Sequence, residues 1–387
     1  MKRFAGAALI SAVVAGCSSD DSADSSGPSV RELLDLPPRF ELPAIPESNP
    51  LTAEKIRLGR LLFYDRRLSG NQTQSCSSCH HQELAFADGL RVPQGSTGQT
   101  LHRNSPGLAN VGYHSTLTWS NNGLLSLEDQ IPVPIRADNP VELGVSDGNA
   151  EEVLARFDAD ERYREMFAAA FPKSESGATV NKIVMALASF VRTIISGDSA
   201  FDRYKQGDES ALDESQRRGL SLFNGERLEC FHCHHGVLLS VSYHDANTTA
   251  GTIQYPFFNN GLYNVGGDGS YPSYDQGLYD LTLNPDDRGM FRPASLRNVA
   301  LTAPYMHDGS LPTLRDVILH YSRGGTVTET GQYAGDGRLS PLKSGLVRGF
   351  EINEQEIQDV IAFLNALTDE SLLTNPKLSD PFLEESP

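Results

Sequence analysis

Two identical cysteine motifs constrain this chain more than any other feature. "CSSCH" occupies residues 76–80 and "CFHCH" occupies residues 230–234, so each reads Cys-x-x-Cys-His. In this pattern two thiols add to the vinyl groups of a haem, and the adjacent imidazole lies beneath the iron as an axial ligand. The sequence therefore predicts two covalently bound c-type haems, held by Cys76, Cys79 and His80 and by Cys230, Cys233 and His234.

Two other uses of four cysteines have to be weighed against haem attachment. A zinc site usually brings its two cysteine pairs within a few dozen residues, whereas about 150 residues separate these pairs. An exported protein could instead form two disulfides. Neither alternative accounts for a histidine directly after both pairs, so we favour haem attachment.

The N-terminus resembles an export signal. A Met-Lys-Arg start is followed by the short apolar run "FAGAALISAVVAG", which ends in small residues just before Cys17. This arrangement resembles the lipobox of bacterial lipoproteins and predicts a signal peptide over residues 1–17, with acylation of Cys17. An ordinary secretory signal with an incidental cysteine is the alternative. Residues 18–45 would form a flexible tether and an N-terminal arm. We expect a periplasmic protein of Gram-negative bacterial type, anchored by its lipid to the outer membrane.

The charge of the chain argues against one class of partner. Its formal net charge is −18 at pH 7. A chain this acidic repels phosphate backbones, so we expect no nucleic acid partner.

The two cysteine motifs lie in related surroundings. "LGRLLFYDRRLSGNQTQ" precedes the first motif and "RRGLSLFNGERLE" precedes the second, which indicates an internal duplication. A length of 387 residues with 39% hydrophobic residues suffices for two ordinary cores. We predict a mainly α fold of two cytochrome c-like helical haem domains packed together, over residues 46–200 and 201–387. The polar segment 196–216 would bridge them.

Helical periodicity is visible in several places. Residues 181–196 place a hydrophobic stripe on one face and stop at Gly197, and residues 353–368 open with Asn353 and Glu356 in a cap-like arrangement. The stretches 86–150 and 240–312 are rich in Gly, Pro, Asn and Asp and are too long for simple connections. We expect haem to supply the apolar core that keeps these loops ordered.

Longer segments carry a family resemblance. "LGRLLFYDRRLSG", "RNSPGLANV", "LEDQIPVPIRADNPVELG" and "FRPASLRNVALTAPYMHDGSLPTLRDVI" are similar to the bacterial dihaem cytochrome c peroxidase and MauG superfamily. "LTWSNN", "RLECFHCHHG", "SPLKSGLVRGF" and "LTDESLLTNPKLSDPF" resemble its MbnH-like subgroup. The resemblance implies two c-haem domains packed face to face, with the haem at His80 reacting with peroxide.

The resemblance also places a distal pocket over the His80 haem. It assigns catalytic roles to Gln130, Glu142 and Pro134. Heterolysis of an O–O bond requires a carboxylate that moves a proton and a donor that holds the peroxide, which suits this pair. By themselves, a Gln and a Glu on a polar loop would face solvent. Many family members carry a removable histidine where this chain has Ser96, so the peroxide site should be open without reductive activation.

Trp119 and a set of oxygen ligands are assigned in the same way. Trp119, the only tryptophan, aligns with a tryptophan between the two haems and would relay electrons, although a lone tryptophan is commonly core filler. Asn104, Thr302 and Pro304 correspond to calcium ligands, the latter two through backbone carbonyls, and oxygen ligands suit Ca²⁺.

The ligand opposite His234 separates the possible functions. Ordinary family members use a methionine at the end of the helix after "HDG", where this chain has "LRDVILHY" and Tyr321. Leu314, Val317, Ile318 and Tyr321 are spaced to share one helix face, whereas His320 lies off it. Met306 is the competing ligand, and a buried tyrosine with an ordinary hydrogen bond is the structural alternative. His307 matches a family histidine near the second haem with a structural or propionate-binding role.

The resemblance implies an enzyme. The preferred hypothesis is a MauG-like, MbnH-like oxidoreductase that uses hydrogen peroxide to form a high-valent dihaem state, which then oxidises a residue of an exported partner protein. The subgroup implies conversion of a tryptophan to kynurenine. A dihaem cytochrome c peroxidase taking electrons from a small donor cytochrome is the first alternative, and a dihaem electron carrier is the second.

Overall fold

The computed structural model describes residues 27–383, so the predicted signal peptide, Cys17 and most of the tether lie outside the described residues. The described chain is mainly helical. Its strands form two short antiparallel pairs, β1 (Phe258–Asn259) with β2 (Met290–Phe291) and β3 (Val327–Thr328) with β4 (Gly335–Asp336). Within these residues no helix has the length and hydropathy needed to cross a bilayer. The predicted mainly α fold is confirmed.

The N-terminal half, residues 46–200, is organised by two crossing helices. α2 (Ala53–Tyr64) packs against α7 (Val180–Val191), and their apolar faces lie in one large hydrophobic cluster. Gly59 permits this close crossing, because a Cβ atom there would lie 2.0 Å from the carbonyl oxygen of Ala186. The remaining helices surround the pair: α3 (Leu127–Gln130), α4 (Pro132–Arg136), α5 (Ala150–Asp158) and α6 (Glu161–Ala170).

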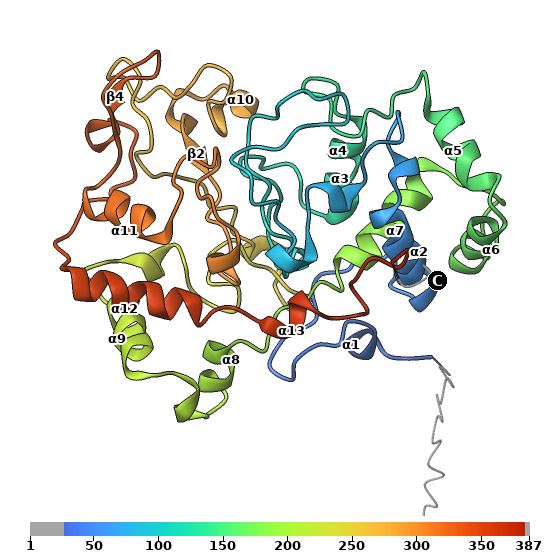
Figure 1. The fold of residues 1–387 in the computed structure, drawn as a ribbon, viewed down its shortest axis with the longest axis horizontal. Coiled ribbons are helices and arrows are strands. Elements are labelled where there is room, and N and C mark those ends of the chain that lie inside the picture. Colours follow the sequence, from blue (N-terminus) through green and yellow to red (C-terminus); the bar gives the residue numbers. More distant parts are fainter. Residues whose placement is uncertain (1–26, 384–387) are drawn as a thin grey trace, which may run out of the picture.

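The C-terminal half, residues 201–383, repeats this arrangement. α9 (Glu214–Phe223) crosses α12 (Glu354–Asn365) over a second hydrophobic cluster, and a Cβ on Gly219 would lie 1.9 Å from the carbonyl oxygen of Asp359. Both glycines lie in the similar segments that precede the cysteine motifs. The other helices of this half are α10 (Tyr279–Thr282), α11 (Leu314–Ser322) and α13 (Glu370–Leu373). Figure 1 shows the two sets of helices on opposite sides, with long loops between them.

The segment predicted to bridge the halves, residues 196–216, is folded. It contains α8 (Ala200–Lys205), whose Asp202 is fully buried and accepts hydrogen bonds from both terminal nitrogens of Arg297 at 2.9 and 3.1 Å. Arg39 makes a further ion pair with Asp202, from the N-terminal arm that includes α1 (Val30–Leu33). A buried charge needs such partners, so these ion pairs fix the segment in place.

The predicted start of one helix agrees with the structure, and the predicted end of another does not. Asn353 caps α12 and forms a capping box with Glu356, as its sequence indicates. α7 ends at Val191 instead of continuing to residue 196, because Asn110 bonds the backbone of Ile194 and Ser196 and replaces helical hydrogen bonds.

The C-terminal segment ties the halves together. After α12 the chain returns to the N-terminal half, where Leu372 and Leu378 are buried in its cluster. The Tyr64 hydroxyl donates to the carbonyl of Leu378 at 2.6 Å, and Figure 1 shows this end of the chain beside α2.

Candidate haem sites

Both cysteine motifs fold as short 3-10 turns, over Cys76–Ser78 and Cys230–His232. None of the four cysteines in residues 27–383 is in a disulfide, so the structure does not support the disulfide alternative. Each turn presents two free thiols and the following histidine, which is the donor set that covalent haem attachment requires.

The two motif histidines are prepared as iron ligands in the same way. His80 Nδ1 lies 2.7 Å from the carbonyl oxygen of Phe86, and His234 Nδ1 lies 3.0 Å from that of Leu239. A carbonyl acceptor requires Nδ1 to carry the proton, which leaves Nε2 free to bind a metal. Burial lowers the pKa of both rings, that of His234 to about 4, so both are neutral. Phe86 and Leu239 both have left-handed backbones, with φ of 63° and 50°.

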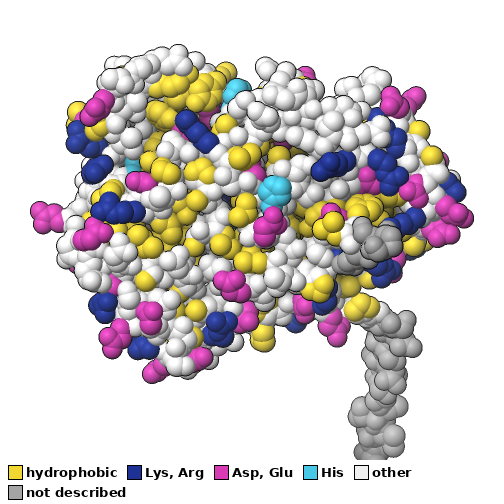
Figure 2. Space-filling view, in the orientation of Figure 1, with side chains coloured by type: hydrophobic (Ala, Val, Ile, Leu, Met, Phe, Trp, Pro, Cys, Tyr) yellow, Lys and Arg dark blue, Asp and Glu magenta, His cyan; other side chains and the backbone are white. Residues whose placement is uncertain are grey.

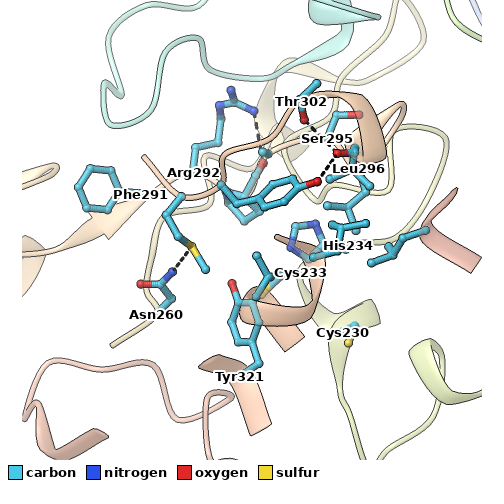
Figure 3. A pocket seen from close by; sticks show the side chains of 18 of the residues that line it. Cys230, Cys233, His234, Asn260, Phe291, Arg292, Ser295, Leu296, Thr302 and Tyr321 are labelled. Atoms are coloured by element: carbon cyan, nitrogen blue, oxygen red, sulfur yellow. Dashed lines mark hydrogen bonds between the residues drawn. The ribbon is translucent and has the colours of Figure 1, made fainter. Parts of the chain in front are cut away.

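A large cavity opens beside the second motif. It encloses about 1920 Å³, part of it open to solvent, and Cys230, Cys233 and His234 line one wall. The predicted face of α11 lines it as well, with Leu314, Val317, Ile318 and Tyr321. Figure 3 shows the Tyr321 side chain rising from its helix into the cavity on which His234 also opens. The cavity and its donors fit a c-type haem with His234 and Tyr321 as its axial candidates.

The contacts of His320 and Met306 can be compared with those of Tyr321, because each is a candidate for the iron ligand opposite His234. His320 uses both ring nitrogens elsewhere, with Nδ1 at 2.8 Å from Thr326 Oγ1 and Nε2 at 3.1 Å from the carbonyl of Asn260. Met306 does line the cavity, and its Sδ accepts a hydrogen bond from Asn260 Nδ2 at 3.3 Å. Burial raises the pKa of Tyr321 to about 12, an effect that a hydrogen bond with Asn260 opposes. Tyrosine therefore faces the cavity and histidine does not.

Arg292 is a feature of the cavity that we did not predict from the sequence. It is 5% exposed and lines the cavity, and burial lowers its pKa to about 10. No carboxylate of residues 27–383 lies within ion-pair distance of it. A buried cation without a counter-charge is costly, and the propionate groups of a haem would supply that charge. Arg292 stands in "FRPAS", where nothing in the sequence distinguishes a buried arginine from an exposed one.

His307 is buried in the same wall. Its ring stacks on Phe291 with centroids 3.7 Å apart, and its Nε2 lies 3.9 Å from Asp275 Oδ2. These contacts suit a structural or propionate-facing role better than a role as an iron ligand.

Glu142 lies near the first motif. It is among the charges that raise the pKa of the Cys76 and Cys79 thiols, and burial raises its own pKa to about 6. The backbone N–H of Leu143 donates to the carbonyl of Pro134 at 3.0 Å, which holds this segment against α4. Gln130, at the end of α3, provides an amide, and Glu142, on the segment held against α4, provides a carboxylate.

Gln130 has an unpaired group. Its Oε1 is buried and accepts no hydrogen bond within the described residues. No hydrogen bond joins Gln130 to Glu142 in that part of the chain. A buried amide oxygen without a partner, together with a carboxylate whose pKa is raised by burial, is what a pocket for a polar ligand requires.

The loop that carries Ser96 is closed tightly onto the Glu142 segment. The N–H of Ser96 donates to the carbonyl of Glu142 at 2.8 Å, and the N–H of Val141 donates to Gln99 Oε1 at 2.7 Å. A Cβ on Gly95 would lie 1.6 Å from the carbonyl oxygen of Val141, so only glycine fits there. His102 is exposed and packs against Tyr274, with ring centroids 5.3 Å apart.

Trp119 and the predicted calcium ligands meet at the same cavity. Trp119 Nε1 donates to the carbonyl of Asn104 at 2.8 Å, and the N–H of Asn104 donates to the carbonyl of His307 at 2.7 Å. Asn104, Thr302 and Pro304 all line the cavity. In residues 27–383 the Asn104 Oδ1 and the carbonyls of Thr302 and Pro304 accept no hydrogen bond, so these oxygens remain available to a hard cation.

Comparisons with known proteins agree on one family. The family model described as di-haem cytochrome c peroxidase matches residues 53–210. The cytochrome-c peroxidase IdrP1 of a Pseudomonas species is 36% identical over 91% of this chain and 88% of its own length. The methylamine utilization protein MauG of Methylorubrum extorquens is 34% identical over 90% of this chain and 89% of its own. A crystal structure of a MauG-like protein associated with microbial copper homeostasis is 50% identical, with a TM-score of 0.87 over 90% of this chain and 99% of that one.

Proposed function

Because the chain belongs to the di-haem cytochrome c peroxidase family, which includes MauG, we propose that it uses hydrogen peroxide to oxidise a residue of an exported partner protein. It is a haem-dependent oxidoreductase, as its relatives are named. The proposed product is kynurenine formed from a partner tryptophan. The N-terminal signal and Cys17 would place the enzyme in the periplasm with a lipid anchor.

Tyr321 is the observation that carries this proposal. It projects from α11 into the cavity that His234 also lines. A thioether ligand favours reduced iron, whereas an anionic phenolate favours oxidised iron. Tyrosine at this position therefore suits a second haem that holds an oxidising equivalent, and methionine would suit one that accepts electrons from a donor.

The residues near His80 would handle protons. When bound, the first haem supplies the two-electron reduction of peroxide to two waters. The Glu142 carboxylate can accept a proton from one peroxide oxygen and return it to the other, and the Gln130 amide can donate a hydrogen bond to the bound peroxide. Trp119, packed at the cavity wall, would connect the two haem sites electronically.

Substitution of Tyr321 tests the proposal. The haem-loaded protein is treated with peroxide in the presence of a candidate exported partner, and mass spectrometry reads oxidation of that partner's tryptophans. Tyr321→Phe should abolish kynurenine formation and change the ferric spectrum of the second haem. Met306→Leu is the matched control, because it removes the rival ligand from the same cavity. An unchanged spectrum and unchanged product in Tyr321→Phe would show that the assignment is wrong.

Met306 supports a second candidate function. If its thioether is the ligand, the protein is a cytochrome c peroxidase that draws electrons from a small donor protein, as the name of its 36% identical relative indicates for that protein. In that case Met306→Leu would alter the spectrum, and reduced donor cytochrome would be oxidised as peroxide is consumed.

A further inference from the structure

Four tyrosines form a continuous line from the wall of the haem cavity to the surface. The ring centroids of Tyr271 and Tyr263 are 5.4 Å apart, those of Tyr263 and Tyr333 are 6.5 Å apart, and those of Tyr333 and Tyr274 are 5.8 Å apart. These separations lie in the range of aromatic rings in contact. The line runs from a residue that is 2% exposed, Tyr271, to one that is 41% exposed, Tyr274.

The inner end of the line meets the cavity. The Tyr271 ring lies 5.9 Å from that of Phe291 and 6.0 Å from that of His307, and both of these residues line the cavity. Trp119 and Tyr263 pack against the hydrophobic cluster formed by Leu262, Tyr271 and Phe291. The line therefore begins in the group of side chains that contains the only tryptophan of the protein.

Tyr263 also has a proton acceptor. Its hydroxyl donates to Asp308 Oδ2 at 2.6 Å. A phenol that loses an electron becomes strongly acidic, so a carboxylate in contact with it allows the proton to leave with the electron. Asp308 stays in place because its Oδ1 accepts from the Ser310 backbone N–H at 3.1 Å.

The outer end lies on the side of the molecule that carries β2, β4 and α10. Tyr333 precedes β4 and Tyr274 precedes α10. Figure 2 shows hydrophobic side chains gathered on the face over these elements, at the upper left of the view. Tyr274 is an exposed aromatic side chain on this side of the molecule, and such a side chain suits contact with an aromatic side chain of another protein.

We propose, resting on the proposed function, that Tyr271, Tyr263, Tyr333 and Tyr274 are the route by which an oxidisable aromatic side chain of the partner protein, bound at Tyr274, gives up electrons to the peroxide-oxidised haems. Each passage moves one electron inward. Tyr271 gives one electron toward the haems while its phenolic proton stays in the hydrogen bond to Asn259 Oδ1, and Tyr263 then returns an electron to it. Tyr263 gives its phenolic proton to Asp308 and becomes a neutral phenoxyl radical, which takes one electron from Tyr333 and its proton back from Asp308. Half-buried Tyr333 and exposed Tyr274 each release their phenolic proton to water when oxidised and recover one when reduced, and Tyr274 takes its electron from the partner's side chain.

In sum, the partner is oxidised by one electron per passage and the haems are reduced by one. Two passages match the two electrons that one peroxide accepts as it becomes two waters. Electron tunnelling weakens steeply with distance, so several short steps between adjacent rings are faster than one long step.

Radical trapping tests the route without a partner. The haem-loaded full-length protein is mixed with peroxide and a nitroso spin trap, and the trapped tyrosine is located by peptide mass spectrometry. We expect the adduct at Tyr274. Tyr263→Phe should lower the Tyr274 adduct about tenfold and slow the return of the haem spectrum to its ferric form. Asp308→Asn should have the same effect, since it removes the proton acceptor and keeps the side chain's shape.

Tyr255→Phe is the matched control. Tyr255 is 44% exposed, close to the value for Tyr274, and has no ring contact in residues 27–383. Its removal should leave the Tyr274 adduct unchanged. An adduct at Tyr255, or a Tyr274 adduct that Tyr263→Phe leaves undiminished, would overturn the route.

Partner oxidation separates the two proposals. If the wild-type protein oxidises partner tryptophans and Tyr274→Phe does so at the same rate, the route is wrong and the proposed function stands. If the adduct forms at Tyr274 through Tyr263 but no exported partner is oxidised, the route stands and the proposed function fails.

Discussion

Glu142 lies in surroundings that raise the pKa of its carboxyl group to about 6, because burial disfavours the charged form. The proposed role of Glu142 needs the carboxylate, which is present above this pH and lost below it. The rate of reaction with peroxide should therefore rise with pH through about 6 and then level off. Stopped-flow measurements of the haem spectrum after mixing with peroxide would record this profile.

The variant Glu142→Gln should react about 100-fold more slowly and lose the inflection, since an amide cannot accept the proton. Glu152→Gln is a control, because the Glu152 side chain is 72% exposed. If the rate of the Glu142→Gln variant still rose with pH through about 6, the inflection would belong to a group other than Glu142.

Among single residues, those that bind through a local motif were predictable. The spacing of the two Cys-x-x-Cys-His motifs predicts the haem sites, and helical periodicity places Tyr321 on the α11 face that lines the cavity. The roles of Arg292 and Asp308 could not be predicted from the sequence. Only the tertiary fold buries Arg292 at the cavity, and only the fold brings Asp308 to Tyr263, which is 45 residues away.

At the scale of elements, the two helix crossings depend on a glycine. In the C-terminal half a Cβ on Gly219 would lie 1.9 Å from the Asp359 carbonyl oxygen and 2.9 Å from Phe363 Cβ. Gly219→Ala must therefore push α9 away from α12, and such overpacking costs about 1–3 kcal/mol of unfolding free energy. Denaturant titration followed by far-UV circular dichroism measures the loss.

Gly345→Ala is the appropriate control for this variant, since no atom lies within 4 Å of a Cβ placed there. Equal stability of the two variants would mean that the crossing relaxes without cost. Gly59→Ala should weaken the α2–α7 crossing in the same way, because its Cβ would lie 2.0 Å from the Ala186 carbonyl oxygen.

Among the helices, features set by neighbouring residues could be predicted from the sequence, and features set by distant residues could not. The cap at Asn353 is local and was predicted correctly, since its partner Glu356 is three residues away. The end of α7 and the folding of α8 depend on Asn110, Arg39 and Arg297, which are distant in sequence. Local propensity carries no information about such partners, so the sequence does not show how this polar segment is held.

At the scale of the whole molecule, the proposed lipid anchor rests on one residue, Cys17. We expect Cys17→Ser to prevent lipid labelling in cells fed radioactive palmitate and to shift the protein from the membrane fraction to the soluble one. If residues 1–17 are an ordinary secretory signal, the Cys17→Ser variant should show the same lipid labelling and the same fractionation as the wild-type protein. Antibody detection in fractionated cells provides the readout.

The two halves of the chain also meet at the predicted calcium ligands. Asn104 belongs to the N-terminal half, and Thr302 and Pro304 belong to the C-terminal half, yet all three line one cavity. A cation bound by their oxygens would hold the halves together at the position where Trp119 bonds to Asn104. Loss of the cation should therefore loosen both the fold and the electronic connection between the haem sites.

Removal of calcium by a chelator should lower the melting temperature and slow the spread of oxidation from the first haem to the second after peroxide is added. Readdition of Ca²⁺ should restore both, whereas Mg²⁺ should not, because it requires a tighter octahedral set of ligands. Asn104→Ala should reproduce the chelated state and no longer respond to Ca²⁺. A chelated protein that melts and reacts like the untreated one, with no calcium found by elemental analysis, would show that the Asn104 amide and the two carbonyls bind no cation and that direct contacts alone join the halves.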